Sequence, residues 1–378
     1  MPVRAVAAPN VDAETRRYYE ELYSGLPGDS HVTYIVVLTG GSEPEVLEAA
    51  GAYNIILAWP HYNSLPAALE AAAALREVGR YAEVVPLAAP GAEPPLEKIK
   101  KILGVYSLLR SPPRLLLVGR PNKWLVASHV QGKPDGWVDE EEVYRESASI
   151  NALEVAKRLV ESAKESSYSA EDLERIAAYA EALRRRAAGY DGLTLGCWCF
   201  NFDEVKKRGW TPCISLALLN DMGVVATCEG DVRALYSAVV LRRIADKPSW
   251  ISNVNVVRGD VVVLTHDGIP PSMAVEHSLV PRLATKAPAA LRGVVKPGTP
   301  ITLLRVSADL KKAVLLAGRT TEAERVEACA TQVAVRVERG RPEALLTAGL
   351  GNHLAFVLDD VYDEVLTYFK YTGTQIIA

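Results

Sequence analysis

Residues 1–129 of the chain alternate between short, continuous apolar runs and segments of helix-forming composition. This pattern predicts strands and helices in alternation, with strands at 31–39, 54–59, 81–86 and 114–119 and helices at 64–78 and 96–109. Ser42, followed three residues later by Glu45, matches the capping box that begins a helix. Strands that are apolar throughout must be covered on both faces, so the alternation predicts a parallel sheet in a Rossmann-like α/β domain.

Ligands of open parallel sheets bind beyond the carboxyl ends of the strands. That edge of the predicted sheet holds the segments 40–41, 60–63 and 119–122. The Gly40-Gly41 pair lacks the G-x-G-x-x-G pattern of dinucleotide-binding loops, so we interpret it as a tight turn into the following helix. We expect the other two segments to form a rim near a binding site.

The remainder of the chain changes character twice. Residues 130–145 are polar and contain glycines and a proline, which predicts a connection without regular structure. A second alternating region follows, with predicted helices at 150–164, 170–188, 213–219 and 232–244 and predicted strands at 192–200, 224–227, 254–257 and 261–265. We expect Ser169 to be the N-cap of the second of these helices.

From about residue 290 the predicted strands follow one another without long helices between them, which is typical of a small antiparallel barrel or sandwich. A helix at 359–370 ends the chain. The fold class is therefore α/β in three parts: an N-terminal α/β domain at 1–129, a second α/β domain at 130–280, and a C-terminal antiparallel β module at 281–378.

Composition narrows the possible functions. The net charge is −4 with a pI of about 6.0, so there is no overall basic field to attract nucleic acid. No apolar run is long enough for a membrane span, and the N-terminus does not have the pattern of a signal peptide. Five cysteines without an extracellular signature predict a cytoplasmic protein with mostly reduced thiols. The low methionine content would also suit a thermophile, and some thermophiles keep internal disulfides.

Three residues that could bind a metal lie at the ends of predicted apolar segments: Glu229, His266 and His353. Each taken alone has an ordinary structural interpretation, because a carboxylate near a helix start is stabilised by the helix dipole and single histidines often stabilise turns. Asp231 fits the N-cap of the helix that follows Glu229. Carboxylate and imidazole together suit a borderline divalent ion such as Mn²⁺. Spacing alone does not bring the three residues together.

The cysteines give weaker evidence for a second kind of metal site. Cys197 and Cys199 are separated by one residue instead of the two of a zinc knuckle, and neither Cys213 nor Cys228 completes the pattern. We therefore expect buried thiols near a substrate cleft rather than a structural zinc site.

Several segments resemble the L-fucose/L-arabinose isomerase superfamily, in the order in which that family carries them. They are HYNSLPAALE (61–70), GRPNKWLVAS (119–128), the region from GCWCF to CEGD (196–231), SWISNVNVV (249–257), THDG (265–268) and GNHLAFVLDD (351–360). Each motif is short, and their common order over most of the chain is the stronger part of the resemblance.

The resemblance implies a metal-dependent aldose–ketose isomerase that binds Mn²⁺ or another divalent cation and assembles as a homo-trimer or homo-hexamer. Its metal ligands would be Glu229, His266 and His353, with Asn253 as a weaker fourth contact. Glu229 and Asn253 would occupy the catalytic positions. The expected contacts to a small sugar substrate are His61, Asn63, Trp124, Trp198 and Asn352.

One position departs from the family pattern. The segment 252–255 holds Asn253, with Ser252 and Asn255 beside it, where the family has a second acidic ligand. An amide can coordinate through its oxygen, but it brings no negative charge and cannot act as a general base. Two alternatives therefore remain open: a sugar-binding protein that kept the fold and lost catalysis, and an epimerase or lyase that forms the same ene-diolate.

Overall fold

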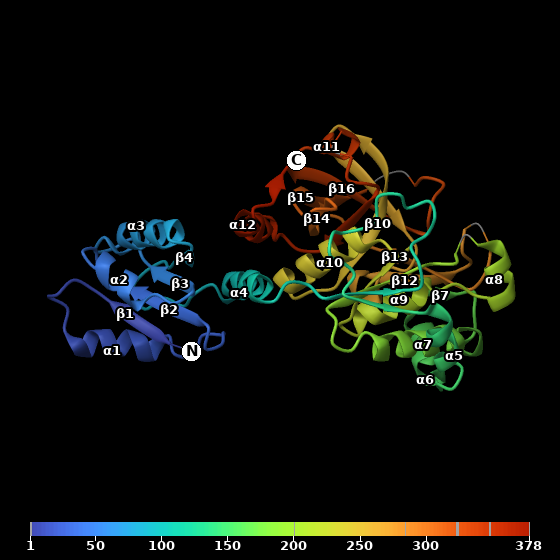
Figure 1. Ribbon diagram of the computed structural model, residues 1–378, viewed down its shortest axis with the longest axis horizontal. Coiled ribbons are helices and arrows are strands. Elements are labelled where there is room, and N and C mark those ends of the chain that lie inside the picture. Colours follow the sequence, from blue (N-terminus) through green and yellow to red (C-terminus); the bar gives the residue numbers. More distant parts are fainter. Residues whose placement is uncertain (1, 200, 284, 323–324, 348, 378) are drawn as a thin grey trace. The chain divides into compact units, whose positions relative to one another are not determined.

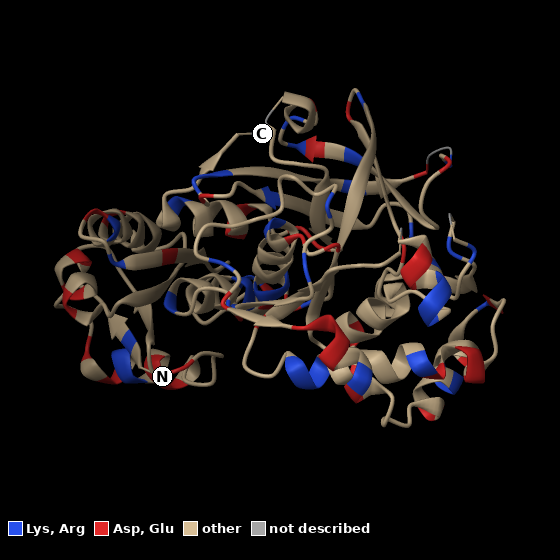
Figure 2. Cartoon of the chain, turned by 45° about the vertical axis from the view of Figure 1, so that its right-hand side comes forward, with Lys and Arg blue, Asp and Glu red and all other residues tan. Residues whose placement is uncertain are grey.

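The computed structural model describes residues 2–199, 201–283, 285–322, 325–347 and 349–377. The chain divides into two compact units, Met1–Ser107 and Leu108–Ala378 (Figure 1). Both predicted domain boundaries, at 129/130 and 280/281, lie within the second unit. No helix among the described residues is long and apolar enough to cross a membrane. Figure 2 shows that acidic and basic residues are interspersed along the elements of the chain.

The N-terminal unit contains a four-stranded parallel sheet in the order β1-β2-β3-β4, which is also the order of the chain. Its elements are β1 (Val3–Val6), α1 (Ala13–Leu22), β2 (Val32–Val37), α2 (Glu43–Ala49), β3 (Tyr53–Ala58), α3 (Ser64–Glu77), β4 (Tyr81–Pro86) and α4 (Leu96–Arg110), the last of which ends beyond the unit boundary. Side chains of α2 and α3 pack with those of the sheet in one buried cluster. The predicted α/β class is confirmed for this unit.

The second unit begins with another parallel sheet, in the order β6-β5-β8-β9. Its strands are β5 (Leu115–Val118), β6 (Gly136–Val138), β8 (Gly192–Leu195) and β9 (Val225–Cys228). The helices in this region are α5 (Glu140–Ser147), α6 (Leu153–Ser162), α7 (Ala170–Arg186), α8 (Phe202–Arg208), α9 (Cys213–Asp221) and α10 (Val232–Ala245).

A larger sheet follows, in the order β14-β17-β10-β11-β16-β15-β18. Because β14 also pairs with β15, six of these strands close into a small antiparallel barrel, as the alternation of strands without helices predicts. The strands are β10 (Ser249–Arg258), β11 (Val261–His266), β14 (Pro300–Val306), β15 (Lys312–Thr321), β16 (Thr331–Arg339), β17 (His353–Val357) and β18 (Gln375–Ile376).

The remaining elements are short. A three-stranded sheet joins β13, β12 and β7, and two helices and one 3₁₀ turn complete the unit. These elements are β7 (Glu165–Ser166), η1 (Pro271–Met273), β12 (Glu276–Val280), β13 (Ala290–Val294), α11 (Ala344–Thr347) and α12 (Tyr362–Thr372).

Helix α10 connects the parallel sheet to the barrel. It packs against β8 and β9 and also against β10, β14 and β17, and nearly all of its residues are buried. A helix that is covered on nearly all sides has little polar face to present to water, and its two partly exposed arginines, Arg242 and Arg243, lie in the last turn. Its N-cap, Asp231, lies two residues after Glu229, so the same helix also fixes the start of the candidate site.

The structure corrects five sequence predictions. The strand at 114–119 is β5, which pairs with β6 and β8 in the second unit instead of extending the N-terminal sheet. The strands predicted at 254–257 and 261–265 belong to the barrel instead of a second α/β sheet. Strand partners are chosen by tertiary packing, which local sequence does not report.

The other three corrections concern helices and the start of the chain. Segment 31–39 is not the first strand, because β1 and α1 precede it. The capping box at Ser42 is absent: its hydroxyl donates to the Thr39 carbonyl, and Glu45 binds Arg16. The predicted connection at 130–145 contains β6 and most of α5, whose N-cap is Asp139. The capping of α7 by Ser169 is confirmed. Phe200, predicted to end a strand and turn, lies outside the described residues.

Candidate metal centre

Glu229, His266 and His353 meet in the second unit although 124 residues separate the first from the last. One potential ligand atom of each residue lies within 4.8 Å of those of the other two. All three side chains are buried, with exposed fractions of 7%, 5% and 0%. The convergence that spacing could not establish is therefore present in the fold.

Glu229 is held at the carboxyl end of the parallel sheet by a tight turn. It directly follows β9 and has φ +68°, which is uncommon for a residue with a side chain. Gly230, at φ +72°, approaches Pro121 closely. A Cβ added to Gly230 would lie 2.5 Å from the Cα of Pro121. Such strained turns are found where the surrounding structure holds a functional residue in place.

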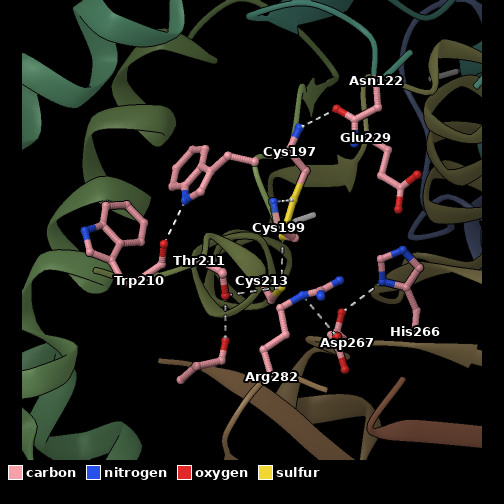
Figure 3. Close-up of a disulfide and its surroundings, with 12 residues drawn as sticks. Asn122, Cys197, Cys199, Trp210, Thr211, Cys213, Glu229, His266, Asp267 and Arg282 are labelled. Atoms are coloured by element: carbon pink, nitrogen blue, oxygen red, sulfur yellow. Dashed lines mark hydrogen bonds and ion pairs between the residues drawn. A yellow bond between two sulfur atoms is a disulfide. The ribbon is translucent and has the colours of Figure 1, made fainter. Parts of the chain in front are cut away.

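The two histidines come from adjoining parts of the barrel. His266 is the last residue of β11 and His353 is the first residue of β17. Their rings are 5.6 Å apart between centroids. Figure 3 shows the Glu229 carboxylate and the His266 ring pointing toward one another.

The hydrogen bonds of both rings leave the same nitrogen available. His353 Nδ1 is 2.9 Å from Asp231 Oδ2, and His266 Nδ1 is 3.1 Å from the carbonyl oxygen of Asp267. Both partners are acceptors, so each Nδ1 donates to its partner and each Nε2 is the nitrogen left for another ligand. Both Nε2 atoms are buried and have no hydrogen-bond partner among the described residues. Burial lowers the pKa of His266, and the neighbouring His353 lowers it further, which favours the neutral ring.

Asp231 does more than the N-cap role predicted from the sequence. It caps α10 by accepting from the Ala234 amide, and its other oxygen accepts from His353 and from Arg305 Nη1 at 2.8 Å. Burial would raise the pKa of Asp231, but the Arg305 charge and His353 outweigh it and lower the pKa to about 2. The ionised carboxylate orients His353, which is the arrangement common behind metal-binding histidines. No local pattern indicates Arg305, because it lies 74 residues from Asp231.

Trp124, a predicted sugar contact, forms a hydrogen bond with Glu229 of the candidate centre. Its indole Nε1 donates to Glu229 Oε2 at 2.8 Å, while half of its side chain is exposed. The ring therefore fixes one carboxylate oxygen and offers a face to solvent. Stacking of a sugar on that face stays a prediction.

Asn253 and Asn352 bind each other. Asn253 pairs with Thr265 on β11 and with His353 on β17, so it lies between the two strands that carry the histidines. Its side-chain oxygen accepts from Asn352 Nδ2 at 2.8 Å. The oxygen that would coordinate a cation thus already has a partner. Both predicted roles, fourth ligand for Asn253 and substrate contact for Asn352, stay predictions.

A cavity of about 740 Å³ lies beside Trp124 and is also lined by Asn122, Cys197 and Trp198. Trp198 is largely buried, donates from Nε1 to the Trp210 carbonyl, and packs edge-on against Tyr179 and Trp210. It is thus part of an aromatic cluster at the cavity wall. Its contact with a substrate stays a prediction.

His61 and Asn63 belong to the N-terminal unit. They lie in the turn between β3 and α3, where Asn63 has φ +56° and precedes the first residue of the helix. His61 is exposed. Their predicted contact with a substrate in the second unit stays a prediction.

The expectation of mostly reduced thiols holds for three of the five cysteines. Cys197 and Cys199 form a disulfide, whereas Cys213, Cys228 and Cys329 are free (Figure 3). The bonded pair lies just beyond β8, and Cys228 is the last residue of β9. Cys197 also lines the cavity beside Trp124, and the expected position of the thiols beside a substrate cleft stays a prediction.

Comparison with known proteins adds no assignment: no protein-family model matches the chain, and no curated protein matches it.

Proposed function

We propose that this protein is a metal-dependent aldose–ketose isomerase that uses Mn²⁺ or a similar divalent cation and acts on a small sugar through an ene-diolate. The observation that carries the proposal is the convergence of Glu229, His266 and His353 within 4.8 Å. The resemblance in motif order to the fucose and arabinose isomerases supports the same function. A Rossmann-like N-terminal domain and a homo-oligomeric, cytoplasmic protein are parts of this proposal.

The residues fit a divalent ion of intermediate softness. Two neutral imidazoles and one carboxylate form a nitrogen and oxygen donor set, which suits Mn²⁺ and its neighbours. The two buried Nε2 atoms, which have no hydrogen-bond partner in the described part of the chain, are the strongest local support for metal ligation. Glu229 alone would leave one positive charge on a bound divalent ion, so we expect weaker binding than in a site with two acidic ligands.

A divalent ion in this position would polarise the carbonyl and adjacent hydroxyl oxygens of an open-chain sugar. Proton movement between the two carbons must then come from the protein. Asp231 is bound to Arg305 and His353, and Asp267 forms an ion pair with Arg282 and accepts from the Ala330 amide. Glu229 remains the best-placed base, because Trp124 binds only one of its oxygens in the contacts described above.

A second candidate function is a sugar-binding protein without catalysis. Asn253 favours it, because the position of the family's second acid holds an amide that cannot act as a general base and whose oxygen accepts from Asn352. An epimerase or lyase that forms the same ene-diolate would need the same Glu229 and is separated from the isomerase by its product.

The first test is metal content. The purified chain is incubated with Mn²⁺, desalted and assayed for bound metal beside His353→Ala, with His277→Ala as the matched control. His277 is also buried but lies outside the centre. We expect about one ion per chain, lost in His353→Ala and kept in the control. Equal retention in all three proteins would contradict the proposed ligands.

The second test is a panel of aldoses with the Mn²⁺-loaded chain and Glu229→Gln. An isomerase gives the matching ketose, and the Glu229→Gln variant abolishes turnover. Sugar binding that is indifferent to this substitution, without any product, would support the second candidate. A product other than the ketose would identify the epimerase or lyase.

A further inference from the structure

Four of the five cysteines lie together at the carboxyl edge of the parallel sheet β6-β5-β8-β9. The sulfurs of Cys197, Cys199 and Cys228 all lie within 4.8 Å of one another, and all three residues are buried. Cys213 is close by, with its Sγ 3.6 Å from that of Cys199. Figure 3 shows Cys197, Cys199 and Cys213 in one group beside Glu229.

The fold brings these thiols in from separate elements. Cys197 and Cys199 follow β8, Cys228 ends the neighbouring strand β9, and Cys213 is the first residue of α9. The carboxyl ends of neighbouring parallel strands meet at one edge of the sheet, so Cys228 at the end of β9 lies beside the two cysteines that follow β8. The knuckle spacing tested on the sequence cannot detect such a set, because it requires the ligands to be close in the chain.

Polar groups around the sulfurs suit thiolates. The Cys199 amide donates to Cys197 Sγ at 3.3 Å, and the Thr211 hydroxyl donates to Cys213 Sγ at 3.8 Å. Burial raises the pKa of the Cys213 thiol to about 11, and the buried guanidinium of Arg282, which forms an ion pair with Asp267, opposes that rise only in part. Hydrogen bonds to sulfur and a nearby cation both offset the negative charge of a thiolate cluster.

We propose that Cys197, Cys199 and Cys228, in the reduced chain, bind one thiophilic divalent cation of the Zn²⁺ type, with Cys213 placed to supply a fourth sulfur. This thiol site is separate from the Glu229–His266–His353 centre and does not depend on the isomerase proposal. The two sites prefer different ions because their donor atoms differ. Soft sulfur ligands select Zn²⁺ and similar cations, whereas nitrogen and oxygen ligands suit Mn²⁺.

Occupation of the site requires reduction of the Cys197–Cys199 disulfide. An external dithiol supplies the two electrons and two protons: its sulfurs become a disulfide, and Cys197 and Cys199 become thiols. Binding of the divalent cation by three cysteines then releases three protons and leaves three thiolates on the metal. The disulfide and metal-bound forms exclude each other because both use the same two sulfurs.

The test uses Cd²⁺ as the probe, because its sulfur charge-transfer absorption in the ultraviolet reports only thiolate ligation. The full chain is reduced with a dithiol, freed of reductant without air, and titrated with Cd²⁺. We expect the absorption to rise to a plateau at one ion per chain. The same chain titrated before reduction is the internal control and should show no such absorption at that stoichiometry.

Three variants complete the experiment. Cys228→Ser should lower the affinity of the chain for Cd²⁺ by at least about 100-fold, since even changes to residues that only contact the ligands can reduce metal affinity by that factor. Cys329→Ser, which removes a thiol outside the three-sulfur group, should bind as the parent does. Glu229→Gln should also keep the absorption, so failure of the isomerase proposal would leave this result unchanged.

Two outcomes overturn the proposal. One is a reduced parent chain, folded by circular dichroism, that shows no sulfur-to-cadmium absorption; this outcome does not depend on the folding of any variant. The other is an absorption that persists with unchanged affinity in a folded Cys197→Ser/Cys228→Ser double variant.

Discussion

Asp231 is the residue on which most local interactions of the candidate centre depend. Its carboxylate caps α10, pairs with the buried guanidinium of Arg305 and fixes the tautomer of His353. Arg305 also donates to the carbonyls of Leu350 and His353, so it holds the segment that delivers the histidine. One ionised side chain thus links the helix, the barrel and His353.

We expect Asp231→Asn to separate the capping role from the charge. Asparagine is as good an N-cap as aspartate, so the start of α10 should persist. The charge is lost, which leaves Arg305 buried without its counter-ion and His353 without its anionic acceptor. Metal affinity should fall by about 10–100-fold, and the free energy of unfolding should fall by up to about 3–5 kcal/mol. Metal titration and denaturant unfolding measure the two effects.

The matched control for this prediction is Asp12→Asn, which changes an N-cap aspartate of α1 that accepts from Thr15 and lies in the other unit. It should leave metal affinity unchanged. Equal losses in the two variants, or full metal affinity in Asp231→Asn, would show that the carboxylate does not orient His353.

At the scale of elements, α5 is a helix that was predicted as a connection and that contributes a residue to the cavity. Its signals are present in the sequence, with Asp139 as N-cap and glutamates throughout the first turn. Polar composition and flanking glycines made the segment resemble a connection. The first residue of the helix, Glu140, lines the cavity and lies 3.1 Å from Arg208.

Glu140 predicts a pH dependence of stability. Burial raises the pKa of Glu140 to about 7, against the opposing charge of Arg208. The folded chain therefore keeps this proton at a pH where the unfolded chain has lost it. The stabilisation is complete below the ordinary pKa of 4.5 and is lost as the pH rises through about 7. Glu140→Gln, which imitates the protonated form, should remove this loss, worth up to about 3 kcal/mol.

Thermal unfolding of the parent and of Glu140→Gln between pH 4.5 and 8 measures the effect. Glu142→Gln is the control, because Glu142 is a more exposed residue of the same helix turn that pairs with Arg186. The control should follow the parent. The quantity to compare is the difference in stability between the parent and Glu140→Gln. If this difference is the same at pH 8 as at pH 5, the raised pKa of Glu140 is contradicted.

At the scale of the molecule, the candidate centre ties together segments that are far apart in the second unit. Glu229 follows the parallel sheet, and His266 and His353 come from two strands of the barrel. An ion bound by all three would cross-link these layers only in the folded chain.

Mn²⁺ should therefore stabilise the fold by mass action. At a free concentration 100 times the dissociation constant, we expect about 2.7 kcal/mol of added stability. Chelation should reverse the gain, His353→Ala should not show it, and His277→Ala should show it in full. Calorimetry with and without Mn²⁺ makes the comparison, and an equal gain in His353→Ala would indicate binding elsewhere.

How much of the fold can be predicted from the sequence depends on whether the interactions that determine it are local or long-range. Helices α7, α9 and α10, the cap at Ser169 and the presence of an antiparallel β module toward the C-terminus could be predicted, because apolar periodicity and capping are local properties. The assignment of β5 to the first sheet was wrong, and so was the assignment of β10 and β11 to a second α/β sheet. Those errors concern which strands pair, and pairing depends on residues distant in the chain.

The same division applies to the candidate centre. The chemical types of the candidate ligands follow from the sequence, since a carboxylate and two imidazoles at the ends of apolar segments can be identified without a fold. The folded chain is needed to see that Glu229, His266 and His353 meet, that Asp231 and Arg305 bind behind His353, and that Cys228 lies beside Cys197 and Cys199. The physical reason is that side-chain chemistry belongs to single residues, whereas distance between remote residues is set by the packing of α10, the parallel sheet and the barrel around a common core.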